Sequence, residues 1–219
     1  MEHKIRILKV DLVTHDTSSF IVDKPENYKF EPGQATSVSI NKSNLEKQKR
    51  PFTFASLNKD LVLEFIIKKY QDGITEKIHE LKPGYELIIG DAGGNIEYKG
   101  AGVFIAAGTG ITPFLAILRQ LKEDKKLNGN ALFFSNKTSK DLILENELKD
   151  MLKDKLFLTL TREKKEGYSH GRINAEFIKR RINDFKQEFY VCGPKEFVSD
   201  IKEVLKRLGV KEKLIISEI

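Results

Sequence analysis

The pattern of hydrophobic residues changes near residue 100, and this change limits the folds that the chain can adopt. Before that point, short segments alternate apolar and polar residues, as strands with one buried face do. Turn signals separate these segments: "EPGQ", "QDG", "KPG" and "GDAGG". After that point, apolar strands alternate with segments whose apolar residues recur at helical spacing. We therefore expect a β-barrel domain followed by an α/β domain with a parallel sheet.

The first domain is expected to span residues 1–100 and to form a six-stranded antiparallel barrel. The clearest strand segments are "KIRILKVDLV", "QATSVSI", "RPFTFAS", "LVLEFIIKKY" and "YELIIG", with one helical insert, "ITEKIHELK". The second domain is expected to span residues 101–219 around a five-stranded parallel sheet. Its strands are expected in "VFIAA", "ALFFSN", "LFLTLTR", "EFYVCG" and "KLIISEI". Helices are expected in "TPFLAILRQLKED", "KDLILENELKDML", "NAEFIKRRI" and "PKEFVSDIKEVLKRL".

Composition excludes several classes of protein. The one cysteine among 219 residues, Cys192, can form neither an internal disulfide nor a four-thiolate iron–sulfur cluster. No apolar run is long enough for a membrane helix and the N-terminus does not resemble a signal peptide, so we expect a cytoplasmic protein. The net charge of +6 comes from interspersed lysines and arginines without interleaved aromatics. This pattern argues against nucleic-acid binding and favours an acidic protein partner.

A glycine turn joins a strand to a helix within "VFIAAGTGITPFLAIL", residues 103–118. The apolar run before the turn is typical of a central strand covered on both faces. Gly108 and Gly110 permit a tight turn and a close approach of ligand to backbone. Thr112 is expected to cap the helix, with Pro113 at its first position. The exposed amides of such a helix start suit an anion such as a pyrophosphate, although any strand–helix unit can use glycines to turn.

Several segments, in the order in which the family has them, resemble the ferredoxin–NADP⁺ reductase superfamily over nearly the whole chain. "RPFTFAS" is similar to the family's flavin motif R-x-Y-[ST], "GTGITPF" to its nucleotide loop and "YVCGP" to its C-G-[PD] segment. "FEPGQ" and "LKPG" also lie where the family has turns. The resemblance implies that the barrel binds FAD and that the α/β domain binds a nicotinamide nucleotide.

The resemblance assigns flavin contacts to Arg50, Pro51, Phe52 and Thr53. Arg50 would pair with the FAD pyrophosphate, because its guanidinium fork matches phosphate oxygens. Phe52, where the family commonly has tyrosine, would lie against the flavin ring. Thr53 would hydrogen-bond near flavin N5 as one of two catalytic positions. Strict alternation puts Thr53 on the face opposite Arg50 and Phe52, so all three reach one flavin only at a sheet edge or an irregularity.

A second implied phosphate contact is the loop in "QDGITEKIHEL", which is similar to the family's G-x-x-[ST] loop. Gly73, Ile74 and Thr75 would contact the FAD pyrophosphate, and the spacing places Asp72 at the family's glycine position. Lys68 matches a lysine near the flavin phosphates in some relatives. Its alternative is an ordinary solvated lysine on a strand.

The resemblance also assigns the nucleotide contacts. Gly108, Thr109 and Gly110 would cradle the pyrophosphate, while Cys192 would be the second catalytic position, facing the nicotinamide by packing rather than as a nucleophile. The remaining contacts would be Thr161, Arg162, Gly193 and Pro194. Thr161 and Arg162 match a pair that holds the 2′-phosphate in NADPH-specific relatives, so NADPH is expected and NADH is the alternative. At the C-terminus, Glu218 and Ile219 stand where several relatives carry an aromatic residue over the flavin.

The implied function is hydride transfer from NADPH to FAD without a metal. Electrons would then pass to a separate acidic carrier such as flavodoxin or ferredoxin, and a monomer is expected. Two alternatives remain: a flavin reductase or electron-transfer subunit of a larger oxygenase or dehydrogenase complex, and a nucleotide-binding module without catalysis.

Overall fold

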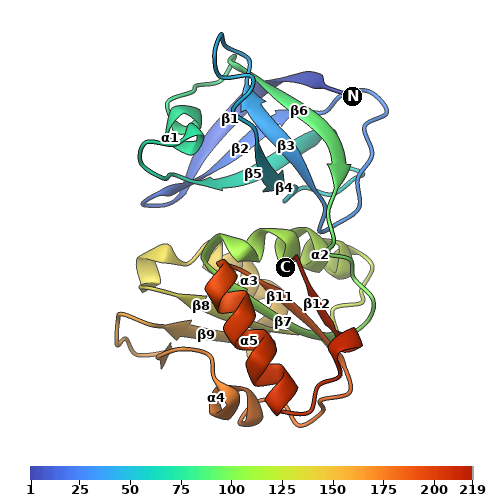
Figure 1. Ribbon diagram of the computed structural model, residues 1–219, viewed down its shortest axis with the longest axis vertical. Coiled ribbons are helices and arrows are strands. Elements are labelled where there is room, and N and C mark those ends of the chain that lie inside the picture. Colours follow the sequence, from blue (N-terminus) through green and yellow to red (C-terminus); the bar gives the residue numbers. More distant parts are fainter. Residues whose placement is uncertain (219) are drawn as a thin grey trace.

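The computed structural model describes residues 1–218, which form a β-barrel stacked on an α/β domain (Figure 1). Strand β6 ends the barrel at Gly93, and β7 begins the parallel sheet at Gly102. Tyr190 ties the segment between these strands to the α/β domain. Its buried hydroxyl accepts hydrogen bonds from the backbone nitrogens of Lys99 (2.9 Å) and Gly100 (3.0 Å).

The barrel is a six-stranded antiparallel sheet, as expected, and its strand order is β4-β3-β6-β1-β2-β5. Its elements are β1 (His3–Thr14), β2 (Thr17–Asp23), β3 (Ala35–Ile40), β4 (Arg50–Thr53), β5 (Val62–Lys68), α1 (Ile74–His79) and β6 (Glu86–Gly93). A backbone bridge between Phe54 and Phe65 joins the two ends of this order and closes the barrel. Strand β2 gives no clear alternation in the sequence because its first four residues, polar and apolar alike, are all buried.

The interior of the barrel is filled by alternate residues of its strands. The side chains of Ile5, Ile7, Phe20, Phe65 and Leu87 are at most 1% exposed and belong to one apolar cluster. Burying side chains of this size typically stabilises a fold by about 1.5–3 kcal/mol each relative to leaving them in water. The period of two seen in the sequence therefore reflects a filled barrel interior.

The second domain is a parallel sheet in the order β10-β9-β8-β7-β11-β12. Its strands are β7 (Gly102–Ala107), β8 (Ala131–Asn136), β9 (Leu156–Leu160), β10 (Ser169–His170), β11 (Glu188–Cys192) and β12 (Ile215–Ser217). The expected count of five strands is wrong by one. The additional strand, β10, has only two residues within a polar loop, and it is therefore too short to show any period.

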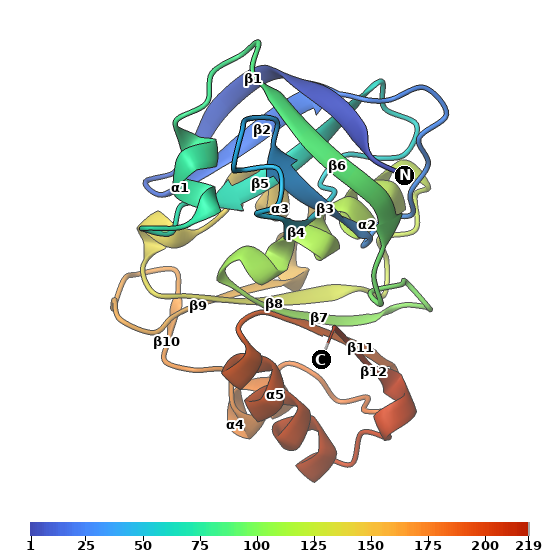
Figure 2. The same ribbon diagram turned by 45° about the horizontal axis from the view of Figure 1, so that its top comes forward.

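Helices cover both faces of the parallel sheet (Figure 2). They are α2 (Thr112–Glu123), α3 (Glu145–Leu152), α4 (Ala175–Lys179) and α5 (Lys195–Arg207), with short 3₁₀ turns η1 (Gly108–Ile111), η2 (Ser139–Asp141), η3 (Lys153–Lys155) and η4 (Glu212–Leu214). The helix expected in "KDLILENELKDML" is divided into η2 and α3, because Leu144 adopts a left-handed conformation with φ of 50°. Strand β7 alternates between two cores: Val103 and Ile105 belong to the cluster containing α5 residues, Phe104 and Ala106 to the one containing α2 residues.

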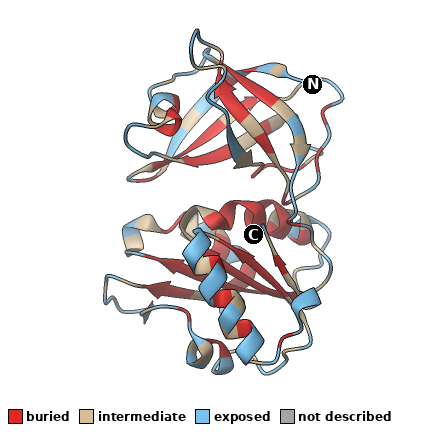
Figure 3. Ribbon diagram, viewed as in Figure 1, coloured by how far each residue is buried: buried red, intermediate tan, exposed pale blue. Residues whose placement is uncertain are grey.

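Helix α2 lies between the sheet and the barrel, and most of its surface is buried (Figure 3). Ala55 and Ile66 of the barrel belong to the same apolar cluster as Phe114 and Ile117 of α2. The two domains are therefore joined by a packed apolar contact. Within the described part of the chain, no helix has the length and apolar character needed to cross a membrane.

Candidate active site

A cavity of about 510 Å³ opens where the barrel meets the start of α2. It is lined by Arg50, Pro51, Phe52, Thr53, Ile66, Lys68, Tyr70, Gly73, Ile74, Thr75, Thr109 and Thr112. The structure thus gathers the residues that the resemblance assigns to FAD, together with Thr109 of the nucleotide loop. The chemistry of this wall fits a dinucleotide: a guanidinium for phosphate, an apolar ring for the flavin and a run of small polar groups.

Strand β4 lies at the edge of the sheet, and this explains how consecutive residues line one cavity. It pairs along its length with β3, with Thr53 opposite Ala35 and Arg50 opposite Val38. The bridge to β5 comes only after the strand ends, at Phe54. Arg50 is exposed and donates to the carbonyl of Lys49 at 3.1 Å, and no carboxylate pairs with its guanidinium among residues 1–218. An unpaired guanidinium beside a cavity suits a phosphate.

The loop before α1 forms the far wall of this first cavity. Asp72 has φ of 59°, the left-handed conformation that favours glycine, which agrees with its place at the family's glycine position. Its side chain is exposed and does not line the cavity, so this acid is not part of the wall that would bind phosphate. The Thr75 hydroxyl accepts a hydrogen bond from the Tyr70 backbone nitrogen at 3.0 Å, which fixes the loop.

A second cavity, of about 500 Å³, adjoins the first across the carboxyl ends of the parallel strands. Its lining residues are Thr17, Lys68, Tyr70, Ala107, Gly108, Thr109, Ser135, Asn136, Lys137, Asp141, Ile143, Thr161 and Pro194. Ligands of open α/β sheets bind at this edge of the sheet. The two cavities share Lys68, Tyr70 and Thr109.

Lys68 is held between the cavities by Asp16, with 2.6 Å between Lys68 Nζ and Asp16 Oδ2. Burial alone would raise the pKa of Asp16, but Lys68 outweighs it and the pKa lies below its usual value. Lys68 is therefore a charged group with a fixed position rather than a freely solvated lysine.

Glycine is required at Gly108 and at Gly110 of the nucleotide loop for different structural reasons. Gly108 has φ of 53° and open space where a side chain would lie, which leaves its backbone accessible to a ligand. A Cβ on Gly110 would be 2.4 Å from the carbonyl oxygen of Cys192, so this glycine permits the turn to pack on the end of β11. The expected cap at Thr112 is wrong: the helix is capped at Ile111, and Thr112 is its first residue.

Cys192 is 7% exposed at the end of β11 and does not line either cavity. Burial, and then the nearby Glu218 carboxylate at 3.9 Å, raise the pKa of the Cys192 thiol to about 12. The thiol is therefore neutral, in agreement with a packing role rather than a nucleophilic one. Gly193 follows it with φ of 156°, and Ile219 lies outside the described residues.

Thr161 lines the second cavity, while Arg162 is exposed and does not line it. The backbone nitrogen of Arg162 donates to the Lys137 carbonyl at 2.9 Å, which joins the ends of β8 and β9. Glu163 accepts a hydrogen bond from the Ser139 backbone nitrogen at 2.6 Å, so its carboxylate is engaged at η2.

Tyr70 and Asn136 are lining residues that sequence reasoning missed. Tyr70 is 57% exposed and belongs to both cavity walls. Asn136 is 5% exposed, and neither atom of its side-chain amide has a hydrogen-bond partner within the described residues. Such a group is costly to bury unless a ligand or water supplies partners. The available signal for Asn136 was the pair of polar residues, Ser135 and Asn136, that ends a strand with an apolar start.

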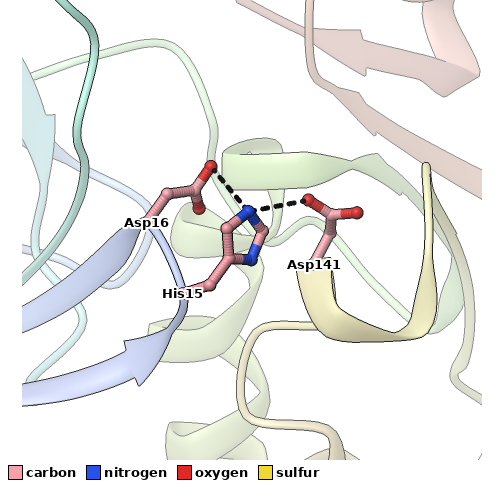
Figure 4. A group of neighbouring side chains, drawn as sticks. All are labelled: His15, Asp16 and Asp141. Carbon is pink, nitrogen blue, oxygen red and sulfur yellow. Dashed lines mark ion pairs between the residues drawn. The ribbon is translucent and has the colours of Figure 1, made fainter.

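His15 of the barrel lies beside Asp141 of the α/β domain, which lines the second cavity (Figure 4). Its Nε2 lies 3.5 Å from Asp16 Oδ2 and 3.9 Å from Asp141 Oδ1. Both carboxylates have other partners, since Asp16 pairs with Lys68 and Asp141 accepts from the Thr138 hydroxyl at 2.6 Å. We therefore interpret this group as a domain contact rather than a metal site.

Comparisons with known proteins agree with this geometry. Residues 2–85 match the family model of an FAD-binding domain, and residues 104–203 match that of an oxidoreductase NAD-binding domain. The chain is 28% identical over 240 residues to one subunit of the 1,2-phenylacetyl-CoA epoxidase from Escherichia coli, covering 97% of this chain and 66% of that protein. It is 26% identical over 232 residues to the ferredoxin–NAD(P)⁺ reductase component of the naphthalene 1,2-dioxygenase system from Pseudomonas putida, covering 99% and 70%.

Solved structures show the same fold. A ferredoxin NADP⁺ reductase from Neisseria gonorrhoeae with bound FAD and NADP superimposes with a TM-score of 0.87 at 21% identity, covering 99% of this chain and 98% of that one. The two family models follow one another along the chain and together match most of its residues. The first match lies on the barrel and the second on the parallel sheet, whose cavities adjoin. The chain belongs to the ferredoxin–NADP⁺ reductase superfamily of FAD-dependent NAD(P)H oxidoreductases.

Proposed function

We propose that this chain transfers hydride from NADPH, with NADH as the weaker donor, to FAD and passes the electrons to a separate acidic carrier such as flavodoxin or ferredoxin. The observation that carries the proposal is the shared wall of the two cavities. Lys68, Tyr70 and Thr109 line both, so ligands in the two cavities would meet there. Hydride transfer requires this proximity, because reacting atoms must approach to about 3–3.5 Å.

The bound FAD would supply the hydride acceptor at its N5 atom. In the first cavity, Arg50 would bind the pyrophosphate, Phe52 would cover one face of the flavin ring and Thr53 would donate or accept a hydrogen bond beside N5. Lys68 would add a second positive charge. In the second cavity, Gly108 and Thr109 would present backbone to the nucleotide pyrophosphate, and Cys192 would pack behind the nicotinamide.

We infer the NADPH preference from the outer end of the second cavity. Arg162 is exposed and follows Thr161, which lines that cavity. Lys164 and Lys165 follow within three residues. These three positive charges would attract a 2′-phosphate dianion, and an arginine can bind the phosphate through two parallel hydrogen bonds.

The acceptor is inferred from charge and from the relatives. Lysines and arginines exceed acids by 38 to 32, so an acidic carrier would be attracted in encounter. The names of both relatives place them in oxygenase or epoxidase systems, which favours an oxygenase component as the second candidate acceptor. This chain spans 66% and 70% of those two proteins, so their partners are candidates here and not assignments.

The first test is the absorption spectrum of the purified protein after reconstitution with FAD. We expect one FAD per chain and bleaching of its visible band on anaerobic addition of NADPH, at lower concentrations than NADH requires. A protein that binds no FAD under any condition would overturn the proposal. Binding of FAD without bleaching by either nucleotide would favour the non-catalytic module.

The second test separates the acceptors by their dependence on salt. Ions screen exposed charges over a Debye length of about 10 Å at 0.1 M, so reduction of flavodoxin or ferredoxin should slow steeply as salt rises. Reduction of a small uncharged dye should change far less. Carrier reduction that is insensitive to salt would argue against docking by charge. Faster turnover of free flavin than of any carrier would establish a flavin reductase instead.

A further inference from the structure

Arg119 lies on α2 where this helix meets the barrel, outside the lining of both cavities. Its Nη1 donates to the Ala55 carbonyl and to Glu64 Oε2, both at 2.6 Å. Its Nε and Nη2 donate to the two oxygens of Glu147 on α3, at 2.6 and 2.9 Å. A single side chain thus connects two segments of the barrel to two helices of the α/β domain.

This junction is partly shielded from water. The side chain of Arg119 is 20% exposed, that of Glu64 is 16% exposed and that of Glu147 is 32% exposed. Glu64 also accepts a hydrogen bond from the Ser19 hydroxyl at 2.7 Å, which anchors it to β2. Burial alone would lower the pKa of Arg119, but Glu147 and Glu64 outweigh it and raise that pKa. The guanidinium is therefore charged at neutral pH.

The anchors of Arg119 are close in sequence to the walls of the first cavity. Ala55 follows Thr53 by two residues, and Glu64 precedes Ile66 by two; both Thr53 and Ile66 line this cavity. On the other side, Arg119 follows Thr112 by seven residues, about 10 Å along a helix that begins at the nucleotide loop. Arg119 therefore reaches the flavin strand and the nucleotide loop through short, regular pieces of chain.

Two other contacts between the domains are less directional. Lys59 and Glu123 form an ion pair whose side chains are about half exposed, at 56% and 46%. Exposed pairs of this kind are weak and mobile. The apolar contact of Ala55 and Ile66 with α2 stabilises the interface, but apolar packing specifies angle less sharply than hydrogen bonds do. Arg119 donates four hydrogen bonds from a rigid planar fork, so it fixes both distance and angle.

We propose that Arg119 is a positioning residue that sets the orientation of the nucleotide loop relative to the flavin strand and so holds the two ligands at hydride-transfer geometry. This inference rests on the proposed function. Because Arg119 lines neither cavity, its replacement should cause a specific defect. Each ligand should bind normally, but the alignment of one ligand with the other should be lost.

The experiment compares wild type with Arg119→Lys and Arg119→Met, each reconstituted with FAD. Isothermal titration with NADP⁺ and the fluorescence of released flavin measure the binding of each ligand. Anaerobic stopped flow then measures flavin reduction by NADPH and the long-wavelength charge-transfer absorbance that reports stacking of nicotinamide on flavin. We expect both affinities to change less than about threefold. We expect the reduction rate to fall on the order of 100-fold in Arg119→Met, as a misplacement of about 1 Å can do, with loss of the charge-transfer band.

Lys59→Met is the matched control, since it removes a cationic link between the same two domains. It should leave the reduction rate and the charge-transfer band unchanged. If Arg119→Met fails to fold because Glu64 and Glu147 are left unpaired, the triple variant Arg119→Met/Glu64→Gln/Glu147→Gln removes those charges and should show the same kinetic defect.

Normal reduction and a normal charge-transfer band in folded Arg119→Met, or in the triple variant, would overturn the inference and leave the proposed function intact. Equal loss in Lys59→Met would also overturn it, because any interdomain link would then suffice. A wild-type protein that does not reduce FAD with either nucleotide would instead reject the proposed function.

Discussion

The two cavity walls are built by different means. On the nucleotide side, the loop at the carboxyl end of β7 brings backbone to the cavity, with open space at Gly108 and with Gly110 packed on β11. On the flavin side, side chains of a four-residue edge strand, β4, form one part of the wall. In the first case the fold itself forms the binding surface, and in the second the fold supports side chains that bind. Substitutions should therefore damage stability on one side and affinity on the other.

Gly110→Ala should have the largest effect and should act on folding. The added Cβ would lie 2.4 Å from the carbonyl oxygen of Cys192 and 2.6 Å from the Gly193 Cα, both of them backbone atoms. We expect a loss of about 3 kcal/mol or more in the free energy of unfolding, measured by urea denaturation. Gly108→Ala is the control: it meets open space and costs only the left-handed conformation, about 1–2 kcal/mol. Equal losses would contradict the packing role of Gly110.

Arg50→Ala should weaken FAD binding and leave folding nearly unchanged. Loss of a charge-assisted hydrogen bond is typically worth about 1.5–3 kcal/mol, or about 10- to 150-fold in the dissociation constant for FAD. Flavin fluorescence titration of the apoprotein measures this. Arg6→Ala, which removes another exposed barrel arginine, should retain wild-type affinity. If Arg50→Ala instead lowered stability in the absence of FAD, β4 would be a structural element rather than a binding one.

Arg162→Ala would sharpen the contrast, because it removes an exposed side chain that follows Thr161 of the nucleotide-side wall without altering the glycine loop. Transition-state binding of NADPH should weaken by about 1–3 kcal/mol relative to NADH if the guanidinium holds the 2′-phosphate. The measurement is kcat/KM for both nucleotides, with the exposed Arg180→Ala as the control. Equal losses for NADPH and NADH would mean that Arg162 only supports the loop.

Asp16→Asn should have the smallest effect, since the Asp16–Lys68 pair is about one-quarter exposed. The pKa of Asp16 is lowered in the folded protein, so the pair stabilises above the ordinary pKa of aspartate and loses this contribution as pH falls through the folded-state value. We expect Asp16→Asn to cost under about 1 kcal/mol at pH 7 and nothing in strong acid. Denaturation at both pH values measures this. A difference that persists in acid would show that charge is not its cause.

The sequence predicted the parts of the molecule that depend on local pattern. The barrel, the parallel sheet and the strand–turn–helix at Gly108 follow from periodicity and glycine placement, and the resemblance assigns the flavin motif to the residues of β4. The residues that were missed depend on pairing between distant segments. Arg119 resembles an ordinary helix arginine in the sequence, and only the arrangement of four segments around it shows that it is partly buried at the domain boundary. Tyr70 becomes a lining residue because two domains meet beside it.

The position of β4 in the sheet explains how Thr53 can line the same cavity as Arg50 and Phe52. Strict alternation places it opposite Arg50 and Phe52, yet all three line one cavity. An edge strand has a side without a ladder partner, so a ligand can reach around it. Sequence alone could not assign β4 to the edge, because strand order depends on long-range pairing.

The barrel closes through the isolated Phe54–Phe65 bridge, and the residues on either side of this seam, Arg50–Thr53 and Lys68, line the first cavity. Among the described residues, this bridge is the single backbone pairing that closes the seam. A ligand in the first cavity would span the seam. Binding energy and conformational stability are then coupled: a ligand at 100 times its dissociation constant adds about 2.7 kcal/mol to the free energy of unfolding. The amides of β4 and the start of β5 should exchange with deuterium fastest in the apoprotein and slow most on reconstitution, so the dinucleotide would complete the barrel as well as use it.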